Sequence, residues 1–222
     1  MDKKIFFNIE KLDKIINQDQ KVFIFNKSRE GTGHSGFALR FCERTLLKNL
    51  LENKVPCAVI HTSYGDTFQD MYRFQEGWKN NTITLEQTEE FDLQASAKII
   101  QYPLYEFKIY GNDTDSILDY TQNFINNKVK YIFITNIEVS EPKNLKIIEK
   151  IMDIAESTDI TFILRPYFYS TKLPKRIEDC KVDFIKDKDS QEITVSCLDK
   201  DGNRVYSEPM KHYQNEGMGY IE

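Results

Sequence analysis

The chain has 222 residues, of which 40% are hydrophobic and 13% aromatic, enough to fill the core of one α/β domain. Lys and Arg number 30 against 35 Asp and Glu, so the net charge of -5 gives no overall attraction to a polyanion. The four cysteines lack the paired spacing of a zinc site, and no apolar run has the form of a signal peptide or the length of a membrane span. We therefore expect reduced core thiols in a cytoplasmic protein, with no bound metal and no membrane contact.

The first part of the chain predicts a strand, a loop, a helix and a second strand. Residues 8–17 carry apolar residues at helical spacing and predict a short lead helix, which a strand over 21–25 follows. The apolar residues of 35–53 recur on one broad face, and the sequence Asn-Lys-Val-Pro ends this helix before a strand over 57–60. This order is a βαβ unit, the building block of a parallel sheet.

Helices and strands continue to alternate through the middle of the chain. Helices are predicted over 66–75, where Asp66 can cap the first turn, and over 84–100, where Thr84 and Gln87 form a capping box. The pattern further predicts a strand over 104–109, a helix capped by the sequence GNDTDS and running through 117–125, a strand over 130–135, a helix from Pro142 to about 157, and a strand over 161–164.

After Pro174 the pattern changes to short strands over 182–185, 193–197 and 205–206, and the sequence DKDGN predicts a hairpin turn between the last two. The fold class is therefore α/β, a mostly parallel twisted sheet flanked by helices with antiparallel strands at its C-terminal end. We expect one domain over 1–222, made of a lead helix in 1–20, a parallel α/β core in 21–174, and an antiparallel edge and tail in 175–222.

The sequence VFIFNKSREGTGHSGFAL, residues 22–39, reads as a buried strand, a glycine-containing loop and the start of a helix. Such a turn can hold an anion with its backbone amides, and in a phosphate-binding loop Lys and then Ser or Thr follow the last glycine. Here His34 and Ser35 hold those two places, so the central cation is missing. A plain glycine-bearing turn is the alternative. The candidates for a vestigial phosphate site are Ser28, Gly31, Gly33, His34, Ser35 and Gly36.

Over nearly its whole length, and in register, the chain resembles the RecA-like motor domain of DnaB-type replicative DNA helicases. The segments that carry the resemblance are IEKLDKIINQDQKVFIFNKSREGTGHSGFAL, CAVIHTSYGDTFQDMYRF, ITLEQTEEFDLQASAKIIQYPLYEFKI, DSILDYTQNFINNKVKYIFITNIE and EITVSCLDKDGNRVYSEP. The resemblance implies a RecA-like P-loop NTPase fold with a degenerate phosphate-binding loop.

At five catalytic positions that the resemblance implies, the chain carries residues unsuited to ATP hydrolysis. His34 stands in place of the lysine that binds the β and γ phosphates. Tyr64, a poor base at neutral pH, stands near the glutamate that activates water, and Thr135 replaces the aspartate that orients the magnesium shell. Tyr167 falls near the sensor of the γ phosphate, and residues 196–199 replace a lysine and an arginine offered to a neighbouring subunit.

These differences predict a pseudo-ATPase that acts as an interaction module in DNA replication, recombination or mobile-element maintenance. Its partners are expected to be other proteins, or further copies of the chain that associate through RecA-like edges. No cofactor is expected, and weak binding of ATP or another anion stays open. One alternative is a divergent active NTPase with relocated groups. The candidates for that role are Lys27, Arg29, Lys200 and Glu138, the last only if the register of its strand shifts.

A second alternative is a protein that binds single-stranded nucleic acid, with DNA as one partner. The sequence RPYFYSTKLPKR, residues 165–176, mixes aromatic side chains that can stack on bases with cations that can neutralise phosphates. In the opposing interpretation, its aromatic side chains pack under a loop and its cations face water. The candidate contacts are Arg165, Tyr167, Lys172, Lys175 and Arg176.

Overall fold

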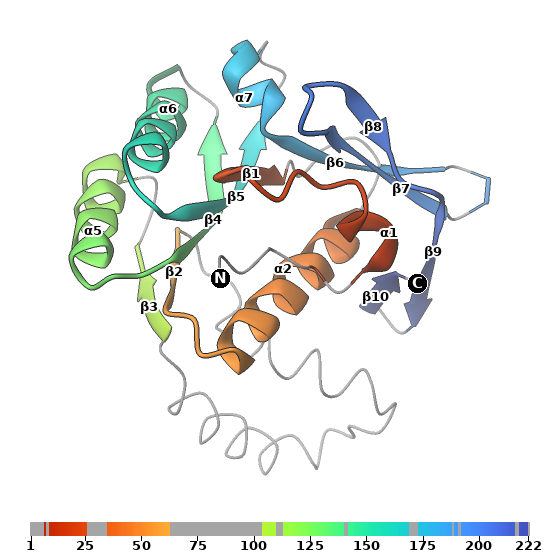
Figure 1. Cartoon of the computed structure of the whole chain (residues 1–222), viewed down its shortest axis with the longest axis horizontal. Coiled ribbons are helices and arrows are strands. Elements are labelled where there is room, and N and C mark those ends of the chain that lie inside the picture. Colours follow the sequence, from red (N-terminus) through yellow and green to blue (C-terminus); the bar gives the residue numbers. More distant parts are fainter. Residues whose placement is uncertain are drawn as a thin grey trace.

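The strands form one twisted sheet between two layers of helices in a computed structural model of the chain (Figure 1). Helix α2 (Ser35–Glu52) crosses one face, and helices α5 (Thr114–Asn126) and α6 (Pro142–Ser157) cover the other. Two short helices, α1 (Glu10–Asp13) and α7 (Lys175–Asp179), precede β1 and β6. The structure describes residues 7, 9–25, 35–62, 104–109, 113–139, 142–168, 173–187, 189–190, 192–215 and 218–221.

The sheet has the strand order β10-β9-β7-β6-β1-β5-β4-β2-β3, and β8 pairs with β7 off this path. All pairings from β3 across to β6 are parallel, and those that involve β7 to β10 are antiparallel. The strands are β1 (Val22–Phe25), β2 (Cys57–His61), β3 (Leu104–Lys108), β4 (Tyr131–Val139), β5 (Thr161–Phe168), β6 (Lys181–Lys186), β7 (Glu192–Leu198), β8 (Arg204–Tyr206), β9 (Met210–Asn215) and β10 (Met218–Ile221).

Alternation along the strands builds one core on each face of the sheet. In β1, Phe23 and Phe25 belong to the core under α2, whereas Val22 and Ile24 belong to the core under α5 and α6. All four residues are buried, which is why the strand reads as a continuous apolar run. We call the two layers the α2 core and the α6 core. The carboxyl ends of β1, β2, β4 and β5 lie at the same edge of the sheet, which we call the carboxyl edge.

Most predicted elements are confirmed. Helices α2 and α6 match the predicted ranges within one residue, and α5 has the predicted cap. Asp113 accepts hydrogen bonds from the backbone amides of Asp115 and Ser116 at 3.2 and 3.3 Å and from Ser116 Oγ at 2.6 Å. The turn between β7 and β8 is also confirmed, because Gly202 takes a φ of 79° there. The helices predicted over 66–75 and 84–100 lie outside the described residues.

The lead helix is shorter than predicted, because α1 is a single turn and not a helix over 8–17. The carboxylate of Asp13 accepts hydrogen bonds from the backbone amides of Phe7 and Ile9 at 2.7 and 3.2 Å. These bonds hold the residues that precede α1 against its last residue. Leu12 and Ile16 still lie buried in the α2 core. The apolar spacing therefore reports burial correctly but overstates the length of the helix.

The parallel part of the sheet extends further along the chain than predicted. Strand β6 lies within the segment expected to form an antiparallel edge, yet it pairs in parallel with β1 through Lys181 and Val182. The antiparallel part begins only with β7. Helix α7 and strands β9 and β10 were not predicted. Among the described residues, no helix is long and apolar enough to cross a membrane.

Candidate functional site

The predicted phosphate loop connects β1 to α2 at the carboxyl edge. Ser28, Gly31, Gly33 and His34 lie outside the described residues, so the loop itself stays a prediction. The described backbone shows α2 beginning at Ser35 and Gly36, directly after the loop. The order strand, loop and helix start is thus as the sequence predicts. In open parallel sheets, ligands bind beside such carboxyl ends.

A chain of three hydrogen-bonded side chains, which we call the edge relay, lies at the carboxyl edge on the α2 side. It consists of Glu106 from β3, His61 from β2 and Thr135 from β4. His61 Nε2 lies 2.8 Å from Glu106 Oε1, and His61 Nδ1 lies 3.3 Å from Thr135 Oγ1. His61 and Thr135 are in register on adjacent strands, so alternation carries both side chains to one face. His61 is 1% exposed and Thr135 is 7% exposed.

The chemistry of the three groups fixes the direction of the hydrogen bonds when the ring is neutral. A carboxylate only accepts, so His61 Nε2 donates to Glu106 and His61 Nδ1 is left to accept from the Thr135 hydroxyl. The carbonyl of Thr135 accepts from Thr62 Oγ1 at 2.8 Å. The hydroxyl hydrogen of Thr135 is therefore committed to His61.

The edge relay does not fit the magnesium site that the resemblance implies at the end of β4. Magnesium takes carboxylate and phosphate oxygens in this kind of site, and Thr135 supplies no negative charge. Its hydroxyl also belongs to a buried hydrogen bond with His61. Within the described part of the chain, no group of three or more His, Cys, Asp or Glu residues could hold a metal ion.

Arg165, a predicted nucleic-acid contact, lies inside the protein. It is in register with Thr135, and its Nη1 donates to Glu43 Oε2 of α2 at 3.1 Å. The side chains of Arg165 and Glu43 are 7% and 6% exposed. Both interpretations of the segment 165–176 place its cations at the surface, and for Arg165 this is wrong. The guanidinium instead joins β5 to α2.

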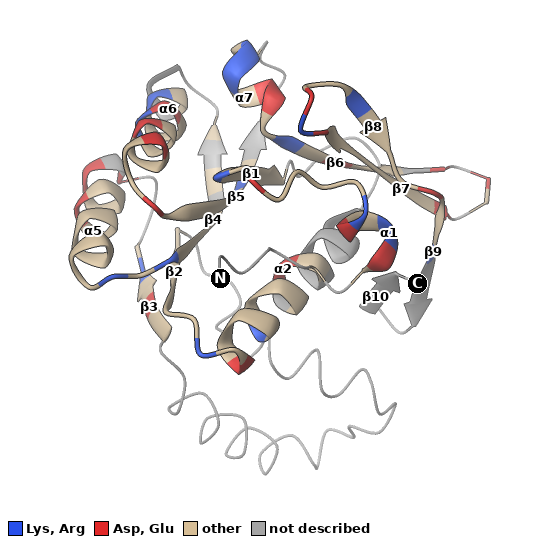
Figure 2. Cartoon of the chain, in the orientation of Figure 1, with Lys and Arg blue, Asp and Glu red and all other residues tan. Residues whose placement is uncertain are grey.

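Arg176, a second cation of that segment, forms ion pairs with α6. Arg176 of α7 lies 2.7 Å from both Asp153 Oδ1 and Glu156 Oε1, and the hydrogen bonds that it donates to these carboxylates raise its pKa above the usual value. Lys175 is exposed at the start of α7. Figure 2 shows positive and negative residues interspersed over the described elements. Tyr167 lies in β5, Lys172 lies outside the described residues, and their predicted role stays untested.

A β-bulge in β4 changes which residues face α2 beyond Thr135. The register with β5 shifts between Thr135 and Ile137, and Ile137 pairs with Pro166, which has no backbone N–H to donate. Thr135 lies on the α2 face, but Ile137 and Val139 are 0% and 1% exposed and belong to the α6 core. The backbone of β4 therefore places position 138 on the α2 face. The relocated role that the sequence suggested for Glu138 stays a prediction.

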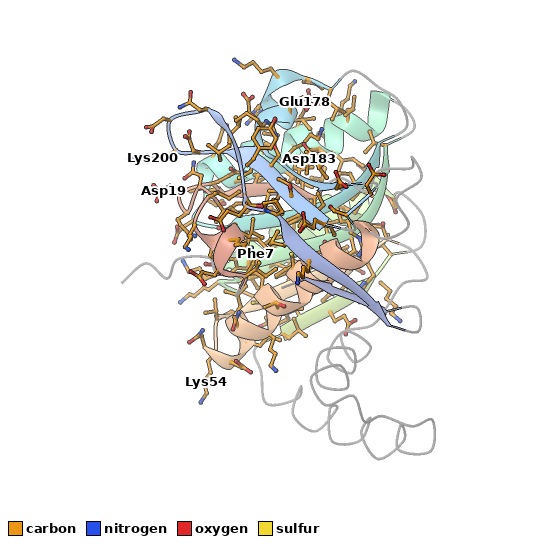
Figure 3. All side chains as sticks on the ribbon, turned by 90° about the vertical axis from the view of Figure 1, so that its right-hand side faces the viewer. Phe7, Asp19, Lys54, Glu178, Asp183 and Lys200 are labelled. Carbon is orange, nitrogen blue, oxygen red and sulfur yellow. The ribbon has the colours of Figure 1, made fainter. Side chains whose placement is uncertain are left out.

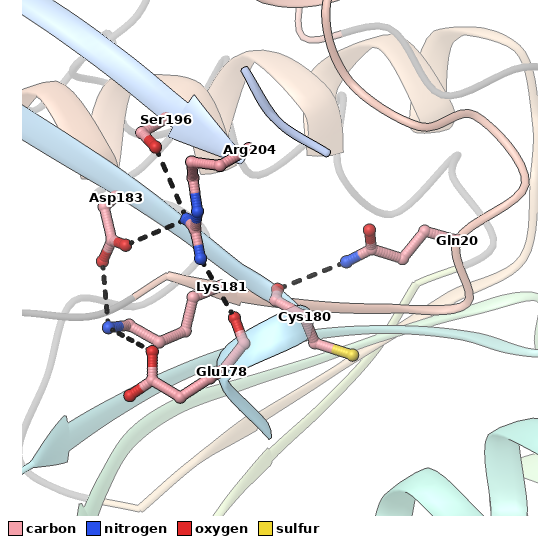
Figure 4. Close-up of polar contacts among 7 residues, drawn as sticks. All are labelled: Gln20, Glu178, Cys180, Lys181, Asp183, Ser196 and Arg204. Atoms are coloured by element: carbon pink, nitrogen blue, oxygen red, sulfur yellow. Dashed lines mark hydrogen bonds and ion pairs between the residues drawn. The ribbon is translucent and has the colours of Figure 1, made fainter. Parts of the chain in front are cut away.

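The C-terminal strands hold a network of polar contacts (Figure 4). Arg204 of β8 contacts Asp183 Oδ2 at 3.5 Å and Ser196 Oγ at 3.4 Å, while Lys181 contacts Asp183 Oδ1 at 3.4 Å and Glu178 Oε2 at 3.2 Å. Each cation thus meets a carboxylate of its own chain. Gln20 completes the group by donating to the carbonyl of Cys180 at 3.2 Å.

Two positions that the resemblance assigns to cations, Ser196 and Cys197, are 3% and 2% exposed in β7. Asp199 instead accepts hydrogen bonds from the amides of Asp201 and Asn203 within the turn. Lys200 lies in the same turn, at the tip of the hairpin (Figure 3). As predicted, the hairpin accounts for the place of this lysine.

The sequence interpretation missed Glu43, His61 and Glu106. Each lies far in sequence from its partner, and the nearest of these pairs is 45 residues apart. The available signal was that His61 and Thr135 each follow a run of apolar strand residues, which brings polar groups together on adjacent parallel strands. Pairing the ends of these apolar runs could have found His61 and Thr135, but it could not have found Glu106, which lies in the middle of β3, or the ion pair of Glu43.

At the sequence level, no protein-family model and no curated protein matches the chain. The fold, however, is similar to that of a DnaB-like replicative helicase studied for its interactions with primase, with a TM-score of 0.62 and 11% identity over 98% of this chain. The chain spans 62% of the length of that helicase.

Two further solved structures have a fold similar to that of this chain. An ATPase domain has a TM-score of 0.64 and 11% identity, with 97% of this chain and 90% of that domain covered. A KaiC-like protein from the hyperthermophilic archaeon Pyrococcus horikoshii has a TM-score of 0.60 and 12% identity, with 99% of each chain covered. The chain therefore shares the mostly parallel α/β fold of these structures, and the RecA-like fold implied by the resemblance is confirmed.

Proposed function

We propose that the chain is a DnaB-like domain that does not hydrolyse ATP and acts as an interaction module in DNA replication, recombination or mobile-element maintenance. The observation that carries this proposal is Thr135, which ends the regular part of β4 and directs its hydroxyl to His61 at 3.3 Å. The sequence adds His34 in place of the lysine. Phosphoryl transfer concentrates negative charge on the phosphates. A site that lacks both the lysine and the aspartate that holds magnesium has little to stabilise that charge.

Other proteins, or further copies of the chain, are the partners that we propose. The DnaB-like neighbour was studied for its interactions with primase, which supports a replication protein as a class of partner here. In the described sheet, β3 and β10 are the outermost strands, and strand edges are surfaces through which chains associate. The net charge of -5 argues against general coating of DNA.

Phosphate release from ATP tests the proposal directly. We expect no release above background, with or without single-stranded DNA, from the wild-type chain. A Ser35→Ala variant serves as the control, because Ser35 holds the phosphate-loop position that an active enzyme would need. Saturable ATP hydrolysis that this substitution abolishes would contradict the proposal.

A divergent NTPase is the second candidate, and the β-bulge of β4 is the observation that favours it. The bulge gives position 138 the same face as Thr135, so Glu138 is the acidic residue placed nearest in sequence to the expected magnesium position. If this candidate is right, Glu138→Gln abolishes hydrolysis, and Glu149→Gln on α6 leaves it unchanged. A crystal structure with a nucleotide analogue would show whether position 138 faces the nucleotide.

A further inference from the structure

Strand β8 pairs with β7 on one side, and in the described part of the chain no strand pairs with its other side. Directly before and after β8, Asn203 and Ser207 form backbone hydrogen bonds of 2.9 Å toward the β7 side. Backbone groups in an antiparallel strand alternate between its two sides. The N–H and C=O groups of Arg204 and Tyr206 therefore point away from β7, and we call this side of the strand the free edge of β8.

The free edge of β8 is accessible. Arg204 and Tyr206 are both exposed, and Tyr206 is 60% exposed. Among the described residues, neither forms a backbone hydrogen bond on this outer side. Unpaired backbone groups of this kind let an extended segment of another protein add to a sheet as a further strand. Because β8 has only three residues, the side chains around it must supply much of the specificity.

The side chains beside the free edge leave an aromatic ring open and match the one cation of the strand. Tyr206 is in register with Ser196, and Ser196 is in register with Asp183, so the three side chains share one face of the antiparallel strands. Arg204 lies across this face and contacts Asp183 Oδ2 at 3.5 Å and Ser196 Oγ at 3.4 Å (Figure 4). The exposed ring of Tyr206 can then attract a cation from outside the chain.

Acidic side chains flank β8 at both ends. In the turn before it, Asp199 and Asp201 outnumber Lys200. After it comes Glu208, whose side chain is 82% exposed. Lys11 lies 4.0 Å from the carboxylate of Glu208, but its Nζ donates to a backbone carbonyl at 2.7 Å. The free edge therefore lies between carboxylates that complement a positively charged segment.

We propose that the free edge of β8 binds a short basic segment of a partner protein, which adds to the sheet as a strand. The backbone of this segment pairs with Arg204 and Tyr206, and its cationic side chains lie against the Tyr206 ring and near Asp201 and Glu208. The inference rests on the proposed role as an interaction module, for which it names the chemistry of the partner. It does not rest on the absence of ATP hydrolysis, so phosphate release and strand addition can fail independently.

Amide hydrogen exchange, followed by NMR, tests the free edge residue by residue. In the wild-type chain alone, the amides of Arg204 and Tyr206 should exchange faster than that of Val205, which points toward β7. The probe is a peptide with blocked ends and the sequence Lys-Lys-Val-Thr-Val-Lys-Lys. At saturation it should slow exchange at Arg204 and Tyr206 about tenfold and leave Val205 unchanged. The same peptide with glutamate in place of lysine should bind at least about tenfold more weakly.

Tyr206→Pro and Tyr206→Val form a matched pair, because both lack the ring and only proline lacks the outward N–H. We expect Tyr206→Pro to bind the lysine peptide about tenfold more weakly than Tyr206→Val. Slow exchange at Val205 shows that β8 still pairs with β7 in each variant. Asp201→Asn and Glu208→Gln should each weaken binding about threefold at low salt, whereas Asp119→Asn on the exposed side of α5 leaves it unchanged.

Several results would overturn the proposal. These are no binding of the lysine peptide, equal binding of the glutamate peptide, or slowed exchange on other strands in place of Arg204 and Tyr206. Sedimentation gives a further test, because a dimer of the wild-type chain that Tyr206→Pro abolishes would assign the free edge to a second copy. Equal binding of the lysine peptide by Tyr206→Pro and Tyr206→Val would exclude strand addition.

Discussion

The guanidinium of Arg165 donates to the carboxylate of Glu43 at 3.1 Å in the interior, joining the middle strands of the sheet to α2. Removal of one partner leaves a buried charge without its counterion, which typically costs 3–5 kcal/mol. We therefore expect Arg165→Met, or Glu43→Gln, to lower the free energy of unfolding by about 3 kcal/mol in urea titrations.

A double variant, in which apolar residues replace both Arg165 and Glu43, tests whether the two residues act as a pair. Because the desolvation cost disappears along with the attraction, Arg165→Met combined with Glu43→Leu should come within about 1 kcal/mol of the wild-type chain. Additive losses in the double variant would show that the two residues act separately.

Two lysines occupy left-handed backbone positions at helix ends. Lys54 follows α2 with a φ of 57°, and Lys128 follows α5 with a φ of 59°. Glycine adopts this conformation without the steric cost of a Cβ atom. We expect Lys54→Gly and Lys128→Gly each to raise the free energy of unfolding by about 0.5–1 kcal/mol. Lys54 is visible at the end of α2 in Figure 3.

Lys146 provides the matched control for these two substitutions. It is an exposed lysine inside α6, where the backbone is helical and glycine is unfavourable. Lys146→Gly should therefore lower the free energy of unfolding by about 1 kcal/mol. If all three substitutions destabilise the chain alike, the backbone strain at Lys54 and Lys128 is not relieved by glycine.

The cap of α5 makes stability depend on pH in the acid range. Hydrogen bonds from Ser116, first from its side chain and then from its backbone, lower the pKa of Asp113 below the ordinary value of 3.8. A lowered folded pKa gives stability that is present above pH 3.8 and is lost as the pH falls through the folded pKa. Thermal unfolding of Asp113→Ala should show a lower Tm at pH 7, and the difference from wild type should shrink below pH 3.8. If the difference in Tm between Asp113→Ala and the wild-type chain stays constant below pH 3.8, the ionised carboxylate of Asp113 does not stabilise α5.

The thiols should be unreactive in the folded chain. Burial raises the pKa of Cys57 to about 12 and that of Cys197 to about 11, so little thiolate forms at pH 8. Cys180 also has a raised pKa of about 11 but is only half-buried. We expect iodoacetamide to label the native chain at least a hundredfold more slowly than the unfolded chain, with Cys180 first among these three. Rapid labelling of Cys57 in the folded state would contradict its burial.

The elements with strong apolar periodicity could be predicted from the sequence, because local spacing reports which face is buried. The strand of Val22 to Phe25 and the helix that begins at Pro142 are examples. The lead helix shows the limit of this approach. The apolar residues around Leu12 are buried as expected, but the helix is a single turn, and the carboxylate of Asp13 accepts from the amides of Phe7 and Ile9 on its N-terminal side.

The candidate site could be predicted only in part. The position of Thr135 directly after the apolar residues of β4 follows from the local pattern, and the resemblance suggests which catalytic position it replaces. The contacts of Thr135 do not follow, because they depend on the register of three strands that are far apart in sequence. The bulge beyond Thr135 is likewise a tertiary feature, in which Pro166 of the neighbouring strand lies opposite the irregularity.

Calorimetric titration with ATP and magnesium tests the central claim most directly. That claim is that the carboxyl edge lacks the cation and the carboxylate needed to bind magnesium and ATP. We predict no saturable binding to the wild-type chain at millimolar ATP, and measurable binding once His34→Lys and Thr135→Asp restore the cation and the carboxylate together. Tight, magnesium-dependent binding of ATP to the wild-type chain would contradict the account.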